Sequence, residues 1–297
     1  MRCLVTGSAG FVGKHLTAAL QAGRHTVTGF DLRHGDDIRD YEQIRTAVEA
    51  FEPDRVFHLA AAAWPGESLA DPQRHLDVNA TGTLNLLRAV RAAGSDARVL
   101  LAGTSEEYGY EGHPDGCVIT EDSPCRPTTP YGASKLAAST MGMVYARRFG
   151  LHVAVTRAWN HTGPGRQAVN AESAFARRIV AVERGEADSI PHGDLSSLRN
   201  FTDVRDVIAA YRIAIEQPPG IYNVASESTL SLRDVMNLLL SMSRVPAAPL
   251  KEAAGLGRAD RGTFPGVSAE KLRTAGWVPE IPLAGTFADL LDYWRSR

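Results

Sequence analysis

The sequence predicts an α/β fold in which a doubly wound parallel sheet is followed by a smaller C-terminal region. Strand-like and helix-like segments alternate over residues 1–158, and their short connections imply parallel strands joined by right-handed crossovers. A glycine-rich turn joins the first expected strand to the first helix. After about Trp159 the alternation loosens and proline and glycine become frequent, which indicates an irregular second region over residues 159–297.

Each element of the first region follows from its residue pattern. Short runs rich in β-branched and apolar residues are typical of buried strands, whereas longer amphipathic runs indicate helices. The expected strands are 2–6, 25–31, 55–60, 98–102 and 152–157. The expected helices are 13–22, 41–52, 76–93 and 130–149. We expect residues 199–225 to return to the main sheet, through segments 201–211 and 221–224.

The composition is that of an ordinary globular protein with a sizeable core. Of 297 residues, 44% are hydrophobic and 22% are charged. The formal net charge is −2, so nothing points to nucleic acid or an anionic membrane surface. No apolar run approaches the roughly 20 residues that span a bilayer. Cys3, Cys117 and Cys125 lack a metal-binding spacing and Met1 lies almost on the first strand, so we expect a cytoplasmic protein without metal or signal peptide.

Three glycines follow the first expected strand at three-residue spacing. Gly7 would allow a tight turn, Gly10 a close approach of backbone to a pyrophosphate, and Gly13 close packing of the helix on the strand. Free N–H groups at the start of such a helix bind anions. The pattern predicts a dinucleotide site, whose loop contacts would come from Gly7, Ala9, Gly10, Phe11, Val12 and Gly13.

An acidic residue, Asp31, ends the second expected strand. A carboxylate there can accept hydrogen bonds from both hydroxyls of the adenosine ribose and would repel a 2′-phosphate, which favours NAD over NADP. Arg33 could offset that repulsion, so NADP remains an alternative. Asp37 either lies near the adenine ring or caps the next helix. The other residues expected at the cofactor are Leu32, Ile38, Leu59, Ala60 and Ala61.

Tyr131 and Lys135 lie four residues apart on one expected helix and so share a face. A nearby ammonium and a positive nicotinamide ring both favour the phenolate, so we expect a lowered pKa for Tyr131. Lys135 could also bind the nicotinamide ribose. Thr104, at the carboxyl edge of the sheet, can hydrogen-bond a substrate oxygen beside Tyr131. Glu106 is either a second acid or base or a solvated surface side chain. Together these residues predict hydride transfer on an alcohol or a ketone.

Taken together, these residues resemble the extended short-chain dehydrogenase/reductase family of nucleotide-sugar epimerases, dehydratases and reductases. The resemblance covers nearly the whole chain and implies a Rossmann cofactor-binding domain with a substrate-binding region. Within the family, the sequence is most similar to GDP-4-keto-6-deoxy-D-mannose reductases and GDP-mannose 4,6-dehydratases. The residues that carry the resemblance are 6–13, Asp31, 58–61, Asn79, Thr104, Tyr131, Lys135, and segments 103–109, 159–165, 199–206 and 276–279.

The resemblance also implies a sugar-nucleotide site. By that resemblance Asn160 and Arg199 would contact the substrate, with Arg199 on its diphosphate, and arginine does bind phosphate bidentately. Arg258 and Asp260 stand where the family often has a second phosphate-binding arginine and a ribose-binding acid, but the usual Arg-Pro-x-Asp/Glu pattern is not intact. Trp64 stands where relatives usually carry small polar residues, which implies a reshaped sugar site.

Three functions stay open. The first, and the best guess, is net reduction of a 4-keto-6-deoxy-sugar nucleotide, in which Tyr131 donates a proton to the oxygen at C4. The second is a 4,6-dehydratase or 4-epimerase that oxidises C4 transiently and retains its NAD. The third is a non-catalytic dinucleotide sensor, although a sensor has no need of a proton donor. The family also implies a homodimer that pairs segments 76–93 and 130–149.

Overall fold

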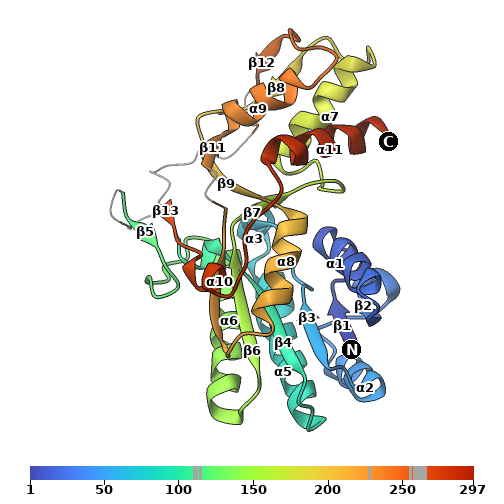
Figure 1. Cartoon of the computed structure of the whole chain (residues 1–297), viewed down its shortest axis with the longest axis vertical. Helices are drawn as coiled ribbons and strands as arrows, with labels where there is room; N and C mark the ends of the chain where they lie inside the picture. Colours follow the sequence, from blue (N-terminus) through green and yellow to red (C-terminus); the bar gives the residue numbers. More distant parts are fainter. Residues whose placement is uncertain (110–112, 114–115, 227–228, 254–255, 257–265) are drawn as a thin grey trace. The chain divides into compact units, whose positions relative to one another are not determined.

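The computed structural model divides the chain into two compact units, whose elements Figure 1 labels. It describes residues 1–109, 113, 116–226, 229–253, 256 and 266–297. The first unit comprises Met1–Ala158, Ile208–Val224 and the described part of Pro265–Val278. The other described residues form the second unit. Residues 199–225 are therefore divided between the units, because the boundary falls at Ile208.

A six-stranded parallel sheet, in the order β10-β6-β4-β3-β1-β2, forms the centre of the first unit. The chain passes from β1 to β2 on one side and then to β3 on the other, so the strand order reverses at β1. In such sheets ligands bind outside the carboxyl ends of the strands at this reversal. The predicted doubly wound parallel sheet is confirmed. Its strands are β1 (Arg2–Thr6), β2 (Thr26–Phe30), β3 (Arg55–His58), β4 (Arg98–Thr104), β6 (Val153–Ala158) and β10 (Gly220–Val224).

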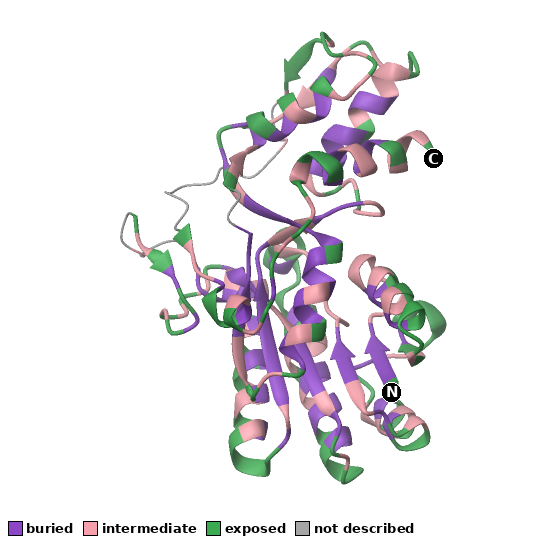
Figure 2. Ribbon diagram, in the orientation of Figure 1, coloured by how far each residue is buried: buried purple, intermediate pink, exposed green. Residues whose placement is uncertain are grey.

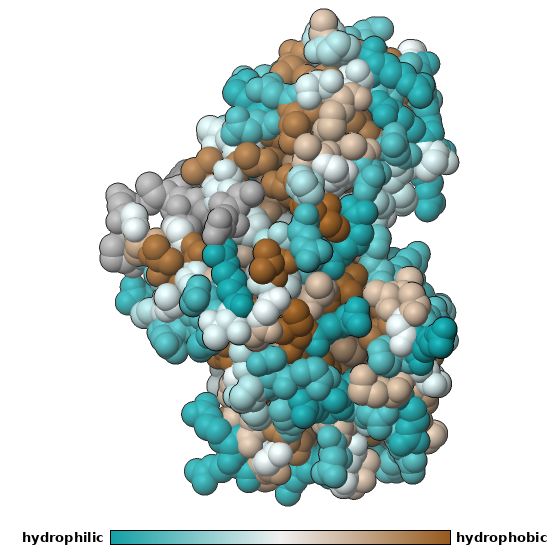
Figure 3. Space-filling view, viewed as in Figure 1, coloured by the Kyte–Doolittle hydropathy of each residue, from teal (hydrophilic) through white to brown (hydrophobic). Residues whose placement is uncertain are grey.

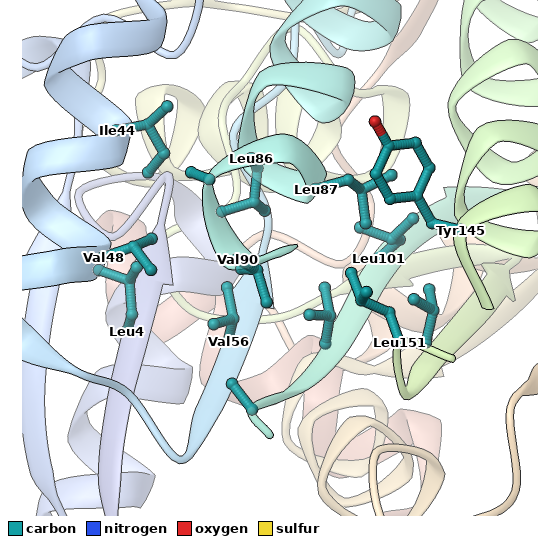
Figure 4. Close-up of a cluster of buried hydrophobic side chains, with 14 of the residues drawn as sticks. Leu4, Ile44, Val48, Val56, Leu86, Leu87, Val90, Leu101, Tyr145 and Leu151 are labelled. Carbon is teal, nitrogen blue, oxygen red and sulfur yellow. The ribbon is translucent and has the colours of Figure 1, made fainter. Parts of the chain in front are cut away.

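Three helices of the first unit bury their apolar sides in one core with the sheet (Figure 4). Leu4 of β1 belongs to this core, whereas its neighbours Cys3 and Val5 are buried outside it, so both faces of β1 are covered. The three helices are α2 (Tyr41–Phe51), α5 (Gly82–Ala92) and α6 (Pro130–Phe149). The unit also contains α1 (Phe11–Ala22), α3 (Pro65–Ala70), α4 (Pro72–His75), α10 (Glu270–Thr274) and the short pair β5 (Val118–Ile119) and β13 (Gly266–Val267).

The expected helix over residues 76–93 has two parts in the structure. Leu76–Thr81 forms a π-helical stretch, and α5 begins only at Gly82. The strands and helices around it differ from the expected bounds by up to two residues, while β1 and α6 match them. The central strands are almost entirely buried (Figure 2), as expected for a sheet covered on both faces.

The second unit has a core of its own, formed by α7 (Ala171–Glu183), α9 (Leu232–Ser241) and α11 (Leu283–Arg295). Phe201 of β9 packs its ring edge-on to Phe287 of α11 within this core. Helix α8 (Val204–Ala214) begins in this unit and continues into the first. The strands of the second unit are β7 (Asn160–Thr162), β9 (Leu198–Asp203) and β11 (Thr229–Ser231) in one sheet, and β8 (Ile190–His192) with β12 (Leu250–Glu252) in another.

The surface gives no sign of a membrane-spanning element among the residues that the structure describes. None of their helices is both long enough and apolar enough to cross a bilayer. On the face shown in Figure 3, hydrophobic residues are interspersed with hydrophilic ones.

Candidate functional site

The glycine turn after β1 has the backbone that its sequence predicts. Gly7 has a φ of +72°, and a Cβ there would lie 2.7 Å from the backbone nitrogen of Ala60. A Cβ on Gly13 would collide with the carbonyl oxygen of Gly7. Gly10 is the N-cap of α1, and neither a side-chain cap nor an acidic residue occupies the first turn of that helix. The turn is therefore packed tightly against the end of β3, with the positive end of a helix dipole beside it.

The carboxylate of Asp31 lies against this turn. Its Oδ2 accepts the N–H of Ala9 at 2.8 Å, and its Oδ1 accepts the N–H of Arg33 at 2.9 Å. The guanidinium of Arg33 in turn donates to the carbonyl oxygen of Ala9 at 2.7 Å. The hydroxyl of Ser8 in the same turn is buried and has no partner among the described residues. Glycines without room for a side chain, an acid at the strand end and an orphaned hydroxyl together fit a dinucleotide.

The loop before α2, which contains Ile38 and Arg39, is held by a side chain of α5. Asn85 donates to the carbonyl oxygens of Ile38 and Arg39, at 3.2 and 2.9 Å. Asp37 does not cap α2, because Asp40 does so and Arg39 binds the Asp37 carboxylate through two nitrogens. The hydrogen bond from Arg39 lowers the pKa of Asp37. The helix-cap alternative for Asp37 is wrong, and its predicted place near the adenine stays a prediction, as does that of Leu32, which is 66% exposed.

A chain of buried hydrogen bonds fixes the backbone at Ala60. Thr6 Oγ1 lies 2.7 Å from His58 Nδ1, and His58 Nε2 lies 2.9 Å from Thr83 Oγ1. Because the Thr83 hydroxyl donates to the carbonyl oxygen of Asn79, His58 Nε2 must be the donor and Nδ1 the acceptor. Burial and the charge of Lys135 lower the pKa of His58 to about 3, so the ring is neutral. Thr6 Oγ1 also accepts the N–H of Ala60, which completes the chain.

Asn79 joins the cofactor side of the site to helix α6. Its side chain accepts the N–H of Ala62 at 2.8 Å and donates both to the carbonyl oxygen of Ala62 and to Ser134 Oγ. Asn79 lies in the π-helical stretch, a form that often marks functional positions because it displaces the side chains that follow. The residue is 1% exposed, so this placement is fixed by packing as well.

The start of α6 places the candidate catalytic residues. Thr129 is the N-cap and accepts the N–H of Gly132, and Pro130 occupies the first helical position, where its missing N–H costs nothing. Tyr131 therefore stands in the first turn, with Lys135 one turn further on. A Cβ on Gly132 would lie 2.6 Å from the carbonyl oxygen of Glu106, so glycine lets α6 approach the turn after β4.

Tyr131 and Thr104 are in contact where α6 approaches the turn after β4. Their side chains are hydrogen-bonded, and this bond lowers the pKa of Tyr131. Burial, with the nearby carboxylates of Glu106 and Glu107, acts more strongly and raises that pKa well above its usual range. The lowered pKa expected from the sequence is therefore wrong for the protein alone, because burial outweighs the hydrogen bond with Thr104. Tyr131 is a phenol at neutral pH and can donate a proton.

Lys135 is buried, at 6% exposure. Burial lowers its pKa to about 8, while the carboxylate of Glu107 acts in the opposite direction. Its ammonium is thus charged at neutral pH but loses its proton sooner than a surface lysine would. Glu106, the other candidate acid, is half-buried and its Oε2 lies 3.5 Å from the hydroxyl of Thr129. That position leaves both interpretations of Glu106 open.

One residue of the site is absent from the sequence-based predictions. Glu107 is fully buried and its Oε1 accepts the N–H of Thr104 at 2.9 Å, while the Thr104 side chain accepts the N–H of Glu106. The signal was present, because Thr104-Ser-Glu-Glu107 has the Thr-x-x-Glu spacing of a capping box. Only the single turn Ser105–Glu107 follows this box, so it does not mark the start of a long helix.

The predicted substrate residues that the structure describes lie in the second unit. Asn160 on β7 pairs with Phe201 on β9, and Arg199 stands two residues before Phe201. Arg199 donates to the carbonyl oxygen of Leu198 at 2.7 Å. Arg258 and Asp260 fall outside the described residues. Among the described residues no group of three or more His, Cys, Asp or Glu side chains could hold a metal ion.

Comparison with known proteins decides the family. The model of the NAD dependent epimerase/dehydratase family matches residues 3–225. The chain belongs to this family. It is 33% identical to GDP-6-deoxy-D-mannose reductase of Pseudomonas aeruginosa, over 100% of this chain and 98% of that protein. It is 31% identical to UDP-glucose 4-epimerase of Streptomyces lividans, over 99% and 96%.

Comparison with solved structures gives the same result. RMD from Pseudomonas aeruginosa complexed with NADPH has a TM-score of 0.90 and 32% identity over 99% of each chain. DesIV, a dTDP-glucose 4,6-dehydratase from Streptomyces venezuelae with NAD and TYD bound, has a TM-score of 0.86 and 25% identity over 100% and 97%. The predictions of an NAD(P)-dependent enzyme of the nucleotide-sugar class, and of its Rossmann fold, are confirmed.

Proposed function

We propose that the protein reduces the 4-keto group of a 4-keto-6-deoxy-sugar nucleotide, with GDP as the nucleotide. The observation that carries the proposal is the half-buried, protonated Tyr131 hydrogen-bonded to Thr104, because reduction of a ketone needs a proton donor beside the carbonyl oxygen. The full-length similarity to GDP-6-deoxy-D-mannose reductase supports the same direction of reaction. We also propose that the enzyme acts in the cytoplasm as a homodimer.

Each side chain has one task in this proposal. The hydroxyl of Thr104 holds the substrate carbonyl oxygen, and Tyr131 gives its proton to that oxygen as negative charge develops there. The ammonium of Lys135 binds the nicotinamide ribose and favours the phenolate that remains on Tyr131. When bound, the reduced nicotinamide supplies the hydride. In the second unit, Arg199 binds the diphosphate and Asn160 the sugar.

Stoichiometry tests this proposal. Purified protein is incubated with a GDP-linked 4-keto-6-deoxy sugar and reduced nicotinamide cofactor, and both the absorbance of the cofactor and the sugar product are followed. The proposal predicts that one cofactor molecule is oxidised for each sugar reduced. Product formation without added cofactor would refute net reduction and support a retained NAD.

The second candidate is a 4,6-dehydratase or 4-epimerase. It is favoured by Glu106, whose carboxylate lies near enough to Tyr131 to raise the pKa of the phenol and could serve as a second acid or base. The discriminating substrate is the unmodified GDP-hexose. Conversion of that sugar with no net change in cofactor absorbance supports this candidate, whereas inertness supports the reductase.

We further propose that NADH is preferred over NADPH. The support is the carboxylate of Asp31 against the glycine turn, since a 2′-phosphate would bring like charge to it. Arg33 lies beside that carboxylate and offsets part of the repulsion. Comparison of kcat/KM for the two cofactors tests this preference, and Asp31→Asn is expected to raise the NADPH/NADH ratio by about tenfold, or 1.4 kcal/mol. An unchanged ratio would assign the discrimination to other residues.

A further inference from the structure

A buried ion pair lies beneath the turn that carries Thr104. Arg157 Nε donates to Glu107 Oε2 at 2.8 Å, and the two side chains are 4% and 0% exposed. Arg157 lies near the carboxyl end of β6, and Glu107 comes from the single turn Ser105–Glu107 that follows the neighbouring strand β4. Replacement of such a pair by apolar side chains is often neutral for stability, so stability alone does not account for it.

The two oxygens of the Glu107 carboxylate have different partners. While Oε2 binds Arg157, Oε1 accepts the backbone N–H of Thr104 at 2.9 Å. Ser139 of α6 also hydrogen-bonds this carboxylate. A Cβ on Gly103 would lie 2.5 Å from Oε1, so glycine at that position lets the carboxylate reach the backbone. Glu107 thus ties the end of β4 to both β6 and α6.

Arg157 is itself held in place. Its guanidinium carbon lies 4.6 Å from the centroid of the Tyr108 ring, and the Tyr108 hydroxyl donates to Asn223 Oδ1 at 2.7 Å. Asn223 on β10 is fixed by Glu121 and by the carbonyl oxygen of Ser268. The buried carboxylate is therefore neutralised by a cation that cannot move away from it, which leaves Oε1 available to Thr104.

We propose that Glu107 is a positioning residue, whose carboxylate oxygen Oε1 holds the backbone of Thr104 so that the Thr104 hydroxyl meets Tyr131. This inference rests on the proposed function, because it assigns to Thr104 a role in turnover. Glu107 touches neither substrate nor cofactor in the proposal. The acceptor atom matters to Thr104, whereas the charge serves only to balance Arg157.

Two matched double variants test the oxygen acceptor of Glu107 separately from the charges of Glu107 and Arg157. Glu107→Gln with Arg157→Met removes both charges but keeps an oxygen acceptor for the Thr104 N–H. Glu107→Leu with Arg157→Met removes both charges and the acceptor. We expect the Gln/Met variant to keep kcat within about threefold of wild type, and the Leu/Met variant to lose at least about tenfold in kcat, with cofactor Kd unchanged in both.

A positioning role makes a further claim that a merely structural one does not. In the Thr104→Val background the hydroxyl is absent, so the Leu/Met and Gln/Met variants should have equal kcat. Amide hydrogen exchange provides a readout independent of turnover: the Thr104 amide should exchange at least about tenfold faster in the Leu/Met variant than in the Gln/Met variant.

Equal kcat and equal Thr104 exchange in the two double variants would overturn the proposal. If the Leu/Met variant does not fold, the Gln/Met variant decides, since a loss of more than about tenfold in its kcat would show that the charge is needed. If wild-type protein has no reductase activity, the proposed function fails separately. The exchange of Thr104 then still decides whether Glu107 holds its backbone.

Discussion

At the scale of single residues, the site depends on the opposite effects of burial on the pKa values of Tyr131 and Lys135. Burial raises the pKa of the phenol and lowers that of the ammonium to about 8. Both groups are therefore protonated at neutral pH before any cofactor binds. That state suits proton donation, since the phenol carries the proton to be transferred and the ammonium can stabilise the phenolate that remains.

Lys135 predicts a pH dependence. Because its ammonium loses the proton as pH rises through about 8, kcat/KM for the cofactor should fall above that pH. Lys135→Arg keeps its charge at all accessible pH values, so the alkaline decrease should shift by at least one pH unit or disappear. The measurement is kcat/KM for the reduced cofactor from about pH 6 to 10. The same alkaline decrease in Lys135→Arg would assign it to another group.

Residue-level prediction from the sequence succeeded where a motif has a geometric reason. Gly7, Gly13 and Asp31 lie where the spacing requires, because a turn without Cβ room admits only glycine. It failed for the pKa of Tyr131, because burial depends on residues far apart in the chain. It also missed the ion pair of Glu107 with Arg157, because the two residues are 50 positions apart in the chain.

At the scale of elements, the glycine turn and α1 depend on close packing against each other. Gly13 lets the first turn of α1 sit against Gly7, and Gly7 in turn sits against the end of β3. The π-helical stretch before α5 was not predictable, because its apolar pattern is also that of an ordinary helix. Its consequence is specific, since Asn79 reaches Ala62 and Ser134 from there.

Gly13→Ala tests the coupling of turn and helix. The new Cβ would collide with the carbonyl oxygen of Gly7, so we expect a loss of about 1–3 kcal/mol in the free energy of unfolding. Cofactor affinity should fall as well, because the turn must shift. Chemical denaturation and cofactor titration measure the two effects.

The matched control is Gly285→Ala in α11, where a Cβ meets nothing within 4 Å. This substitution should be neutral or stabilise by roughly 0.5–1 kcal/mol, because alanine is the better helix former. If the two substitutions had equal effects, close packing at Gly13 would not be the reason for its glycine.

At the scale of the whole molecule, the first unit was predictable and the second was not. Alternating strands and helices with short connections restrict the first unit to a few topologies. The second unit combines strands of three residues, such as β8 and β12, with irregular segments, and such short strands leave little periodicity in a sequence. Tyr131 and Thr104 belong to the first unit and Arg199 to the second.

The proposed homodimer predicts that an exposed apolar residue of α6 lies in the contact between the two protomers. Val144 on α6 is 39% exposed, although Met143 and Tyr145 on either side of it pack in or against the core. If α5 and α6 pair across a two-fold axis, Val144→Glu should weaken association by at least about tenfold, because it places a charge in an apolar contact. Sedimentation at micromolar concentration measures this. Val278→Glu, at a 62% exposed position in the same unit, is the control.

The central claim is that Tyr131 donates the proton in reduction of a 4-keto sugar nucleotide. The most direct test is the kcat of Tyr131→Phe, measured with reduced cofactor whose Kd is determined on the same sample. The account predicts a fall of at least about 10³-fold in kcat with cofactor Kd within about threefold of wild type. A variant that kept more than about a tenth of wild-type kcat would contradict it.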